Sequence, residues 1–447
     1  FQLKIRGNIH QDLRLFQGQE PGSPASIDIR RARVDLQGRL YRVFTFRLQP
    51  ELAGNPYIRN AWFDIEAFSW LHLRLGQMKV PFSSSWLTRD NNLDFIERGS
   101  SSPIYPFFDR GLIVWGDIGQ GSLFYNVGVF TGVGVDRDVK SGDIDDSKDI
   151  AGRLFIQPFV TTDAKPAKGL IFVVEGTWGA MSVPTSRYEL GGLRGANYEA
   201  ALWKWRTEQE IGSDGRVSDV VAATVSRRYR WGVEAHYLLG PWALSAEYLE
   251  LHYLGIAPHH DLYVGSSRKV HELLFEQDGA MRSFSVFTSL FLTGEHKQLT
   301  NGGWKTAKPK NNLGRGGAGA VEVLLRYSRN WADKELFESV SVPGYDALPE
   351  DISGAPPGAE NSVTVSVLSG AHNVHELSAG LSWTINPMVR IQLNDVFLWA
   401  PISDRNGDGQ NDNLMLSGAK SDQSNPDLKG IGTSWENAIM SRVIFKI

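Results

Sequence analysis

Residues 27–82 constrain the fold of this chain most, because they contain four short runs in which apolar and polar residues alternate. In the first run, Ala32 and Val34 alternate with Arg31 and Arg33. A period of two is the signature of a strand with one apolar face and one polar face. Only a few residues separate most of these runs, so the stretch predicts a β-meander.

The two faces of these runs allow two kinds of fold. The apolar face is nearly pure Phe, Leu, Ile, Val and Ala, whereas the polar face carries arginines and carboxylates. In a soluble sandwich the apolar faces meet in a core. In a transmembrane barrel they face lipid, and the polar faces line a lumen. The four runs alone do not decide between these folds.

The rest of the chain favours the barrel. Strand-like runs continue through all 447 residues without a linker, which predicts a single domain over residues 1–447. Short connections alternate with long ones, as in outer-membrane barrels with short periplasmic turns and long extracellular loops, and residues 401–433 read as one such loop. We therefore predict an all-β, transmembrane antiparallel β-barrel of about 16 strands, or 18 if two ambiguous regions split, in the cell outer membrane of a Gram-negative bacterium.

Composition excludes several other classes. No run of 18 apolar residues is present, which excludes a helical membrane span. The chain has no cysteine, which excludes disulfides, thiol catalysis and c-type haem attachment. No G-x-S-x-G motif or other assembled nucleophile and base is found, so we expect no enzyme activity. Phe1 opens directly in a strand-like run, so we expect a mature form whose signal peptide is removed.

Several short blocks, in order, carry a resemblance to a known family. They are residues 30–34 (RRARV), 74–82 (RLGQMKVPF), 95–98 (FIER), 109–112 (DRGL), 125–132 (YNVGVFTG), 239–242 (LGPW), 292–295 (LTGE), 325–328 (LRYS) and 380–387 (GLSWTINP). With these blocks the chain resembles the phosphate-selective porins O and P. The resemblance implies a 16-stranded trimeric porin whose third loop folds inward and narrows the pore. Residues 83–109 match that constriction loop in position.

Arginines are the candidate anion-binding residues of the pore. They are Arg31, Arg33, Arg47, Arg74, Arg228 and Arg230 on predicted strands, and Arg89 and Arg98 in the predicted constriction loop. A guanidinium stays charged and offers several donors to an oxyanion. The alternative is structural, because lumen carboxylates such as Asp35 and Asp64 could pair with these arginines. Within the loop, Asp90, Asp94 and Glu97 oppose an anion preference, and no lysine is present.

One local motif suggests a metal. Oxygen-bearing side chains recur at alternate positions around Gly409, in Asp404, Asn406, Asp408, Gln410 and Asp412. Such spacing is how a loop wraps Ca²⁺, although the twelfth position lacks the bidentate glutamate of an EF-hand. The sequence leaves open a calcium site or a solvated acidic turn, and it indicates no required cofactor.

Two functions remain open. The first is a porin that passes small hydrophilic solutes by diffusion, with a bias towards anions such as phosphate. The second is a barrel that sheathes or anchors a partner protein, such as a cytochrome of an electron conduit or a surface-layer component. The expected partners are the lipid bilayer, lipopolysaccharide, small anions and two further copies in a homotrimer, and no nucleic acid. The content of the lumen discriminates between the two functions.

Overall fold

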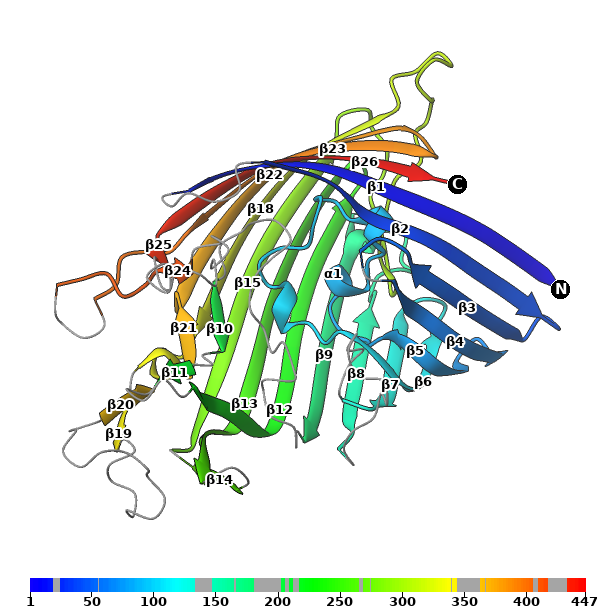
Figure 1. Ribbon diagram of the computed structural model, residues 1–447. Helices are drawn as coiled ribbons and strands as arrows, with labels where there is room; N and C mark the ends of the chain where they lie inside the picture. The colour runs from blue at the N-terminus through cyan, green and yellow to red at the C-terminus, as the bar shows by residue number, and fades with distance from the viewer. Residues whose placement is uncertain are drawn as a thin grey trace.

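The chain closes into a barrel because its first and last strands pair. The computed structural model describes residues 1–18, 25–54, 56–132, 147–164, 166–180, 202–205, 209–211, 217–264, 268–273, 275–338, 340–343, 362–365, 367–404, 409–416 and 432–447. In these residues β1 (Gln2–Gly18) lies between β2 (Ala25–Leu40) and β26 (Trp435–Lys446), antiparallel to both (Figure 1).

Sixteen of the described strands form the wall, each antiparallel to its neighbours. Between β2 and β26 they are β3 (Phe44–Glu51), β4 (Tyr57–Phe68), β5 (Leu71–Lys79), β6 (Phe108–Ile118), β7 (Leu123–Phe130), β8 (Asp149–Ile156), β9 (Leu170–Ala180), β12 (Val217–Leu239), β13 (Trp242–Val264), β15 (Gln277–Phe291), β18 (Ala320–Ala332), β22 (Asn373–Asn386) and β23 (Val389–Trp399). Two short strands, β11 (Gln209–Ile211) and β14 (Arg268–Leu273), extend this sheet at β12 and β13.

The remaining strands form four small pairs that are not part of the wall. They are β10 (Trp203–Trp205) with β21 (Leu368–Gly370), β16 (Gln298–Thr300) with β17 (Gly303–Lys305), β19 (Val340–Pro343) with β20 (Ser362–Val365), and β24 (Met415–Leu416) with β25 (Gly432–Thr433). The described helices are single turns: α1 (Ser84–Leu87), η1 (Asp90–Asn92), η2 (Ser102–Ile104), η3 (Ala167–Gly169) and η5 (Lys334–Phe337). Among the described residues, no helix has the length and apolar character needed to cross a membrane.

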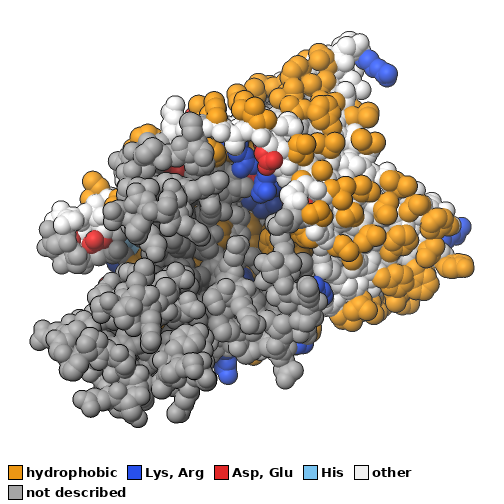
Figure 2. All heavy atoms as spheres, in the orientation of Figure 1, with side chains coloured by type: hydrophobic (Ala, Val, Ile, Leu, Met, Phe, Trp, Pro, Cys, Tyr) orange, Lys and Arg blue, Asp and Glu red, His pale blue; other side chains and the backbone are white. Residues whose placement is uncertain are grey.

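The wall is apolar outside and polar inside, as the period-two pattern predicts. Along β18, the buried Glu322, Arg326 and Ser328 alternate with more exposed residues such as Leu325, which is 48% exposed. Figure 2 shows hydrophobic side chains spread over the outer face of the barrel. This inversion of the usual soluble pattern is expected where lipid replaces water around the wall.

The two ends of the barrel differ in their connections. At one end β4 and β5, β12 and β13, and β22 and β23 are joined by two residues each. This short-turn end is the periplasmic side in barrels of this kind. The longest connection at that end is residues 292–319, between β15 and β18, which contain the β16–β17 hairpin. We call these residues the turn-side insert.

Candidate functional site

Residues 80–107, between β5 and β6, fold into the lumen, and we call them the crossing segment. Ser83 starts α1, because its hydroxyl accepts hydrogen bonds from the backbone N–H groups of Ser85 and Trp86. Trp86 and Tyr105 are buried in an apolar cluster that includes wall residues of β12, β13 and β15. The segment therefore packs against the wall opposite its own strands.

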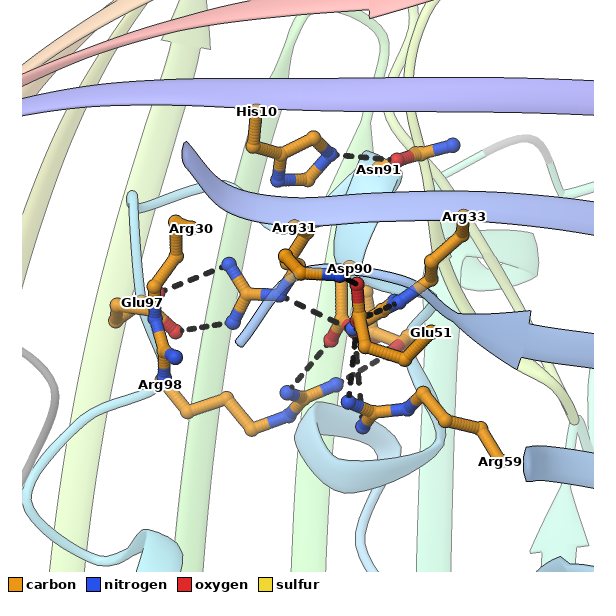
Figure 3. Close-up of polar contacts among 12 residues, drawn as sticks. His10, Arg30, Arg31, Arg33, Glu51, Arg59, Asp90, Asn91, Glu97 and Arg98 are labelled. Carbon is orange, nitrogen blue, oxygen red and sulfur yellow. Dashed lines mark hydrogen bonds and ion pairs between the residues drawn. The ribbon is translucent and has the colours of Figure 1, made fainter. Parts of the chain in front are cut away.

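Glu97 of the crossing segment contacts arginines of β1, β2 and β26, and Figure 3 shows it beside Arg30 and Arg31 of β2. Its carboxylate accepts hydrogen bonds from Arg31 at 2.6 and 2.9 Å and from Arg442 at 2.7 Å. Arg30 Nε donates at 3.2 Å, and Arg442 also donates to Asp12. Burial opposes ionisation of Glu97, but Arg31 and Arg442 hold the pKa of its carboxyl well below the usual value.

Asp90 makes a second contact with the same wall. It accepts hydrogen bonds from Arg33 and, at 2.8 Å, from Arg98 of its own segment, and Arg31 lies 3.5 Å away. Arg33 also donates to Glu51 at 2.5 Å. Burial works against the charged form of Asp90, yet Arg33, Arg31 and Arg98 keep its pKa well below the ordinary value. Acids of the segment and arginines of the wall thus neutralise one another, and we call Asp90, Glu97, Arg31, Arg33, Arg98 and Arg442 the latch.

Most of the arginines proposed from the sequence lie in ion pairs. The pairs are Arg31 with Glu97, Arg33 with Glu51 and Asp90, Arg47 with Asp35, Arg74 with Asp64, Arg98 with Asp90, and Arg228 with Asp149. Arg230 contacts Thr177 Oγ1 at 3.4 Å. Only Arg89 and Arg230 of the eight have no carboxylate within 4.0 Å among the described residues. For the six paired residues the structural role left open by the sequence fits these contacts, and anion binding stays a prediction.

The turn-side insert meets the crossing segment inside the barrel. The backbone N–H of Trp304 donates to Thr88 Oγ1 at 2.9 Å, and Thr306 Oγ1 donates to the carbonyl of Asn91 at 3.1 Å. Gly303 has φ +90°, and a Cβ built there would lie 2.4 Å from the backbone nitrogen of Thr88. Glycine is therefore required for this close approach. The crossing segment and the turn-side insert thus enter the lumen from opposite ends of the barrel.

A basic cavity of about 860 Å³ lies between these two segments and the wall near the short-turn end. Its basic lining residues are Arg6, Arg33, Arg47, Arg59, Arg74, Lys79, Arg89, Lys305 and Lys446, and its acidic ones are Asp35 and Asp90. Enclosure by the barrel, and next the charge of Arg47, lower the pKa of Arg89 to about 10. Burial and the neighbouring Arg89 lower the pKa of Lys305. Neighbouring positive charges thus contribute to both lowered pKa values, which indicates that basic side chains outnumber acidic ones around Arg89 and Lys305 in the cavity.

Several of these cavity residues are absent from the sequence-based set. Arg6 sits in a strand-like run, so its alternation could have identified it. Arg59 is the unpaired residue at a register shift between β3 and β4, which breaks the period-two count. Lys305 belongs to the turn-side insert, and nothing in the local sequence indicates that this segment enters the lumen.

The calcium motif is described only in part. Asn406 and Asp408 lie outside the described residues. Asp404 Oδ2 accepts a hydrogen bond from the backbone N–H of Gly409 at 2.8 Å, which closes a turn across the motif. Most of the predicted extracellular loop, residues 401–433, also falls outside the described residues.

Comparison with solved structures shows a shared fold. OprB of Pseudomonas putida, in a high-pH structure, is 8% identical with a TM-score of 0.50, over 100% of this chain and 94% of that one. An anion-selective porin from Comamonas acidovorans is 10% identical with a TM-score of 0.49, over 100% and 99% of the two chains. OmpT of Vibrio cholerae, an outer membrane protein in a trimer form, is 10% identical with a TM-score of 0.46, over 100% and 99%. At these identities the likeness to OprB concerns the fold alone.

Comparison of sequences shows the family. No curated protein matches the sequence. The model of the family described as phosphate-selective porin O and P matches residues 3–412, which is most of the chain and confirms the resemblance read from its short blocks. Together with the closed barrel, this match shows an outer-membrane porin of a Gram-negative bacterium. The chain belongs to the phosphate-selective porin O and P family.

Proposed function

We propose that the porin favours anions such as phosphate, and that they pass through the basic cavity. The observation that carries this proposal is the imbalance of the lining, where nine basic side chains stand against two acidic ones. In a narrow passage the effective dielectric falls from about 80 towards about 20, so these charges act more strongly than in bulk water. Rows of such residues lower the barrier for anions in a pore.

Arg89 and Lys305 are the side chains we assign to attracting the anion. Neither has a carboxylate within 4.0 Å among the described residues, so their charge is available to a solute. Arg31 and Arg33 differ, since Glu97, Glu51 and Asp90 neutralise them. Their part in selectivity is indirect, because they position the crossing segment.

The proposed domain organisation follows from this assignment. The chain forms one barrel domain over residues 1–447, in which residues 83–109 act as the constriction loop and residues 401–433 as an extracellular loop. No enzymatic step and no required cofactor are part of the proposal. The rival function, a sheath around a partner protein, needs room in the lumen. The crossing segment and the turn-side insert occupy that space with the chain's own residues, which disfavours the sheath.

A planar-bilayer recording tests the proposal through the reversal potential in a salt gradient. We expect the wild type to prefer anions and the double variant Arg89→Ala, Lys305→Ala to lose most of that preference. The matched control is Arg329→Ala, which removes a charge from the outer wall, where Arg329 stacks over Trp331 at 4.9 Å. Cation preference in the wild type would contradict the anion assignment, and a barrel without conductance would favour the sheath.

The proposed partners are bilayer lipid, lipopolysaccharide and two further copies in a homotrimer, with no nucleic acid. The outer wall of β12 to β18 supports a lipopolysaccharide contact, because aromatic and charged side chains gather on it. There Trp231 Nε1 donates to Glu250 at 3.2 Å, and Arg282 lies 3.5 Å from Glu250 and 2.5 Å from Asp333. Aromatic residues are enriched where a membrane protein meets the headgroups. Native electrophoresis of the purified protein checks the trimer.

Calcium binding by the loop around Gly409 also remains a proposal. Asp404, Asn406, Asp408, Gln410 and Asp412 would supply oxygen ligands, and the turn closed by Asp404 and Gly409 supports it. Titration of Ca²⁺ into the chelator-treated protein tests it, with Asp404→Asn as the variant expected to lose binding. Equal Ca²⁺ uptake by the variant and the wild type would favour a solvated turn.

A further inference from the structure

Three carboxylates meet on the inner wall beside the base of the crossing segment. Glu175 of β9, Glu234 of β12 and Glu247 of β13 each offer an oxygen within 4.8 Å of the other two. All three are buried, with at most 7% of each residue exposed. Glu234 and Glu247 occupy directly opposed positions of their strand pair, where like charges destabilise a sheet. The cluster therefore needs compensating positive charge.

The protein supplies only part of that charge. Arg153 Nε donates to Glu175 at 3.1 Å, and its Nη2 lies 3.6 Å from Glu234. The crossing segment adds neutral donors: the backbone N–H of Ser84 to Glu234 at 2.8 Å, and Tyr105 Oη to Glu247 at 3.0 Å. With His236 as a neutral imidazole, three carboxylates and one guanidinium leave a formal charge of about −2 in a buried site, which is costly unless it is compensated.

Two buried atoms at the cluster also lack hydrogen bonds. Among the residues that the structure describes, Oε1 of Glu175 has no hydrogen-bond partner. His236 is 3% exposed; its Nδ1 is held by Ser245 Oγ at 2.8 Å, and its Nε2 lies 3.0 Å from Glu234 Oε2 without hydrogen-bond alignment. His236 Nε2 and Glu234 Oε2 are close but not aligned for a hydrogen bond, and two ligands of one metal ion would have this arrangement.

The space beside the cluster is of the right scale. A small cavity of about 60 Å³ borders Glu234, Glu247 and Ser245, with the crossing segment on its other side. A site for a single water or ion needs only roughly 10–15 Å³. An ion and a remaining water ligand therefore fit next to Glu234 and Glu247, the two carboxylates that border this cavity.

We propose that Glu175, Glu234, Glu247 and His236 bind one divalent cation that accepts both oxygen and imidazole ligands. A metal-bound imidazole is neutral, so a charge of +2 brings the cluster with Arg153 to zero. Manganese suits this ligand set, because carboxylates and water are its common ligands and histidine is the commonest metal-binding side chain. The ion ties β9, β12 and β13 to the base of the crossing segment through Ser84 and Tyr105. This inference does not depend on which solutes pass through the pore.

Equilibrium dialysis of the chelator-treated, detergent-solubilised porin against Mn²⁺ tests the site, with free Mn²⁺ followed by electron paramagnetic resonance. We expect one Mn²⁺ per chain, beyond any uptake by the loop around Gly409, and a thermal unfolding midpoint that rises with Mn²⁺. Glu175→Gln and Glu247→Gln should each weaken binding at least about tenfold. The matched control is Glu376→Gln. Glu376 is a buried wall carboxylate that also accepts a hydrogen bond from the crossing segment, from the backbone N–H of Ser100, but within the described part of the chain it belongs to no such cluster.

The outcomes separate the metal from its alternatives. Loss of Mn²⁺ binding in both cluster variants, with retention in Glu376→Gln, supports the site. Equal Mn²⁺ binding by the wild type and both cluster variants overturns it. A wild-type barrel that binds no Mn²⁺ also overturns it, even if a cluster variant fails to fold, and protons shared between the carboxylates then supply the missing charge.

Discussion

Replacing Glu97 with Gln removes the charge at the centre of the latch. Glu97 is 5% exposed and accepts hydrogen bonds from Arg31, Arg442 and Arg30. Removing one member of a buried ion pair costs about 3–5 kcal/mol, because the remaining charge stays buried without compensation. Arg442 keeps Asp12 and Arg31 keeps Asp90, so we take the lower end, about 3 kcal/mol.

That cost changes the position of the crossing segment. Every 1.4 kcal/mol is about a factor of ten in an equilibrium, so about 3 kcal/mol shifts the ratio of docked to released segment on the order of a hundredfold. We expect single-channel recordings of Glu97→Gln to show higher conductance and more frequent fluctuations than the wild type. Glu97→Asp, which keeps the charge but shortens its reach, should lie between the two.

Glu66→Gln is the matched control, because Glu66 pairs with Arg39 on the same wall, where the Arg39 side chain is 47% exposed. An exposed pair contributes only about 0–1 kcal/mol, so this variant should conduct like the wild type. If Glu97→Gln also conducts like the wild type, the latch does not hold the crossing segment, and the reasoning from its buried ion pairs fails.

Three further predictions concern the same lumen. A Cβ at position 303 would lie 2.4 Å from the backbone nitrogen of Thr88, so Gly303→Val should lower the thermal unfolding midpoint and loosen the turn-side insert. Gly302→Ala is the control, because a Cβ at position 302 would have no contact closer than 3.9 Å. The pKa values of the Asp90 and Glu97 carboxyls are lowered in the folded state. These carboxylates therefore stabilise the docked crossing segment fully at any pH above their ordinary pKa values of about 4, and this stabilisation is lost only as pH falls through the lowered pKa values. Conductance at about pH 5 should therefore equal that at pH 7, and an acid-induced rise at pH 5 would contradict the latch. Because the pKa of Lys305 is lowered, anion preference should begin to fall below the ordinary lysine value of about 10.4 as pH rises, and Lys305→Ala should remove that part of the pH dependence in reversal-potential measurements.

The arginines show how far local sequence can identify a site. Alternation placed Arg31, Arg33, Arg47 and Arg74 on the polar face, and the structure has them on the lumen side of β2 to β5. The alternating pattern does not predict which carboxylate pairs with each arginine. Glu97 reaches Arg31 from 66 positions along the chain and Arg442 from 345, so no local pattern connects them.

The glutamate cluster illustrates the same boundary at the wall. Glu175, Glu234 and Glu247 are separate polar positions in three strands, and each reads as an ordinary lumen residue. They meet because β12 pairs with β9 and β13 in registers that set Glu234 opposite Glu247 and beside Glu175. A shift of one residue in either pairing would separate them, so only the assembled sheet creates the cluster.

The sequence by itself determined the barrel through two features. The period of two requires strands with one apolar and one polar face, and the short connections that alternate with long ones along the whole chain favour a membrane barrel over a soluble sandwich. Its ordered blocks also determined the family. Only the tertiary structure decided what fills the lumen. The latch holds the crossing segment against the wall, the turn-side insert contacts that segment at Gly303, and Arg89 and Lys305 lie at the same cavity. These contacts join segments far apart in the chain, and their energies depend on burial and strand register, which alternation does not record.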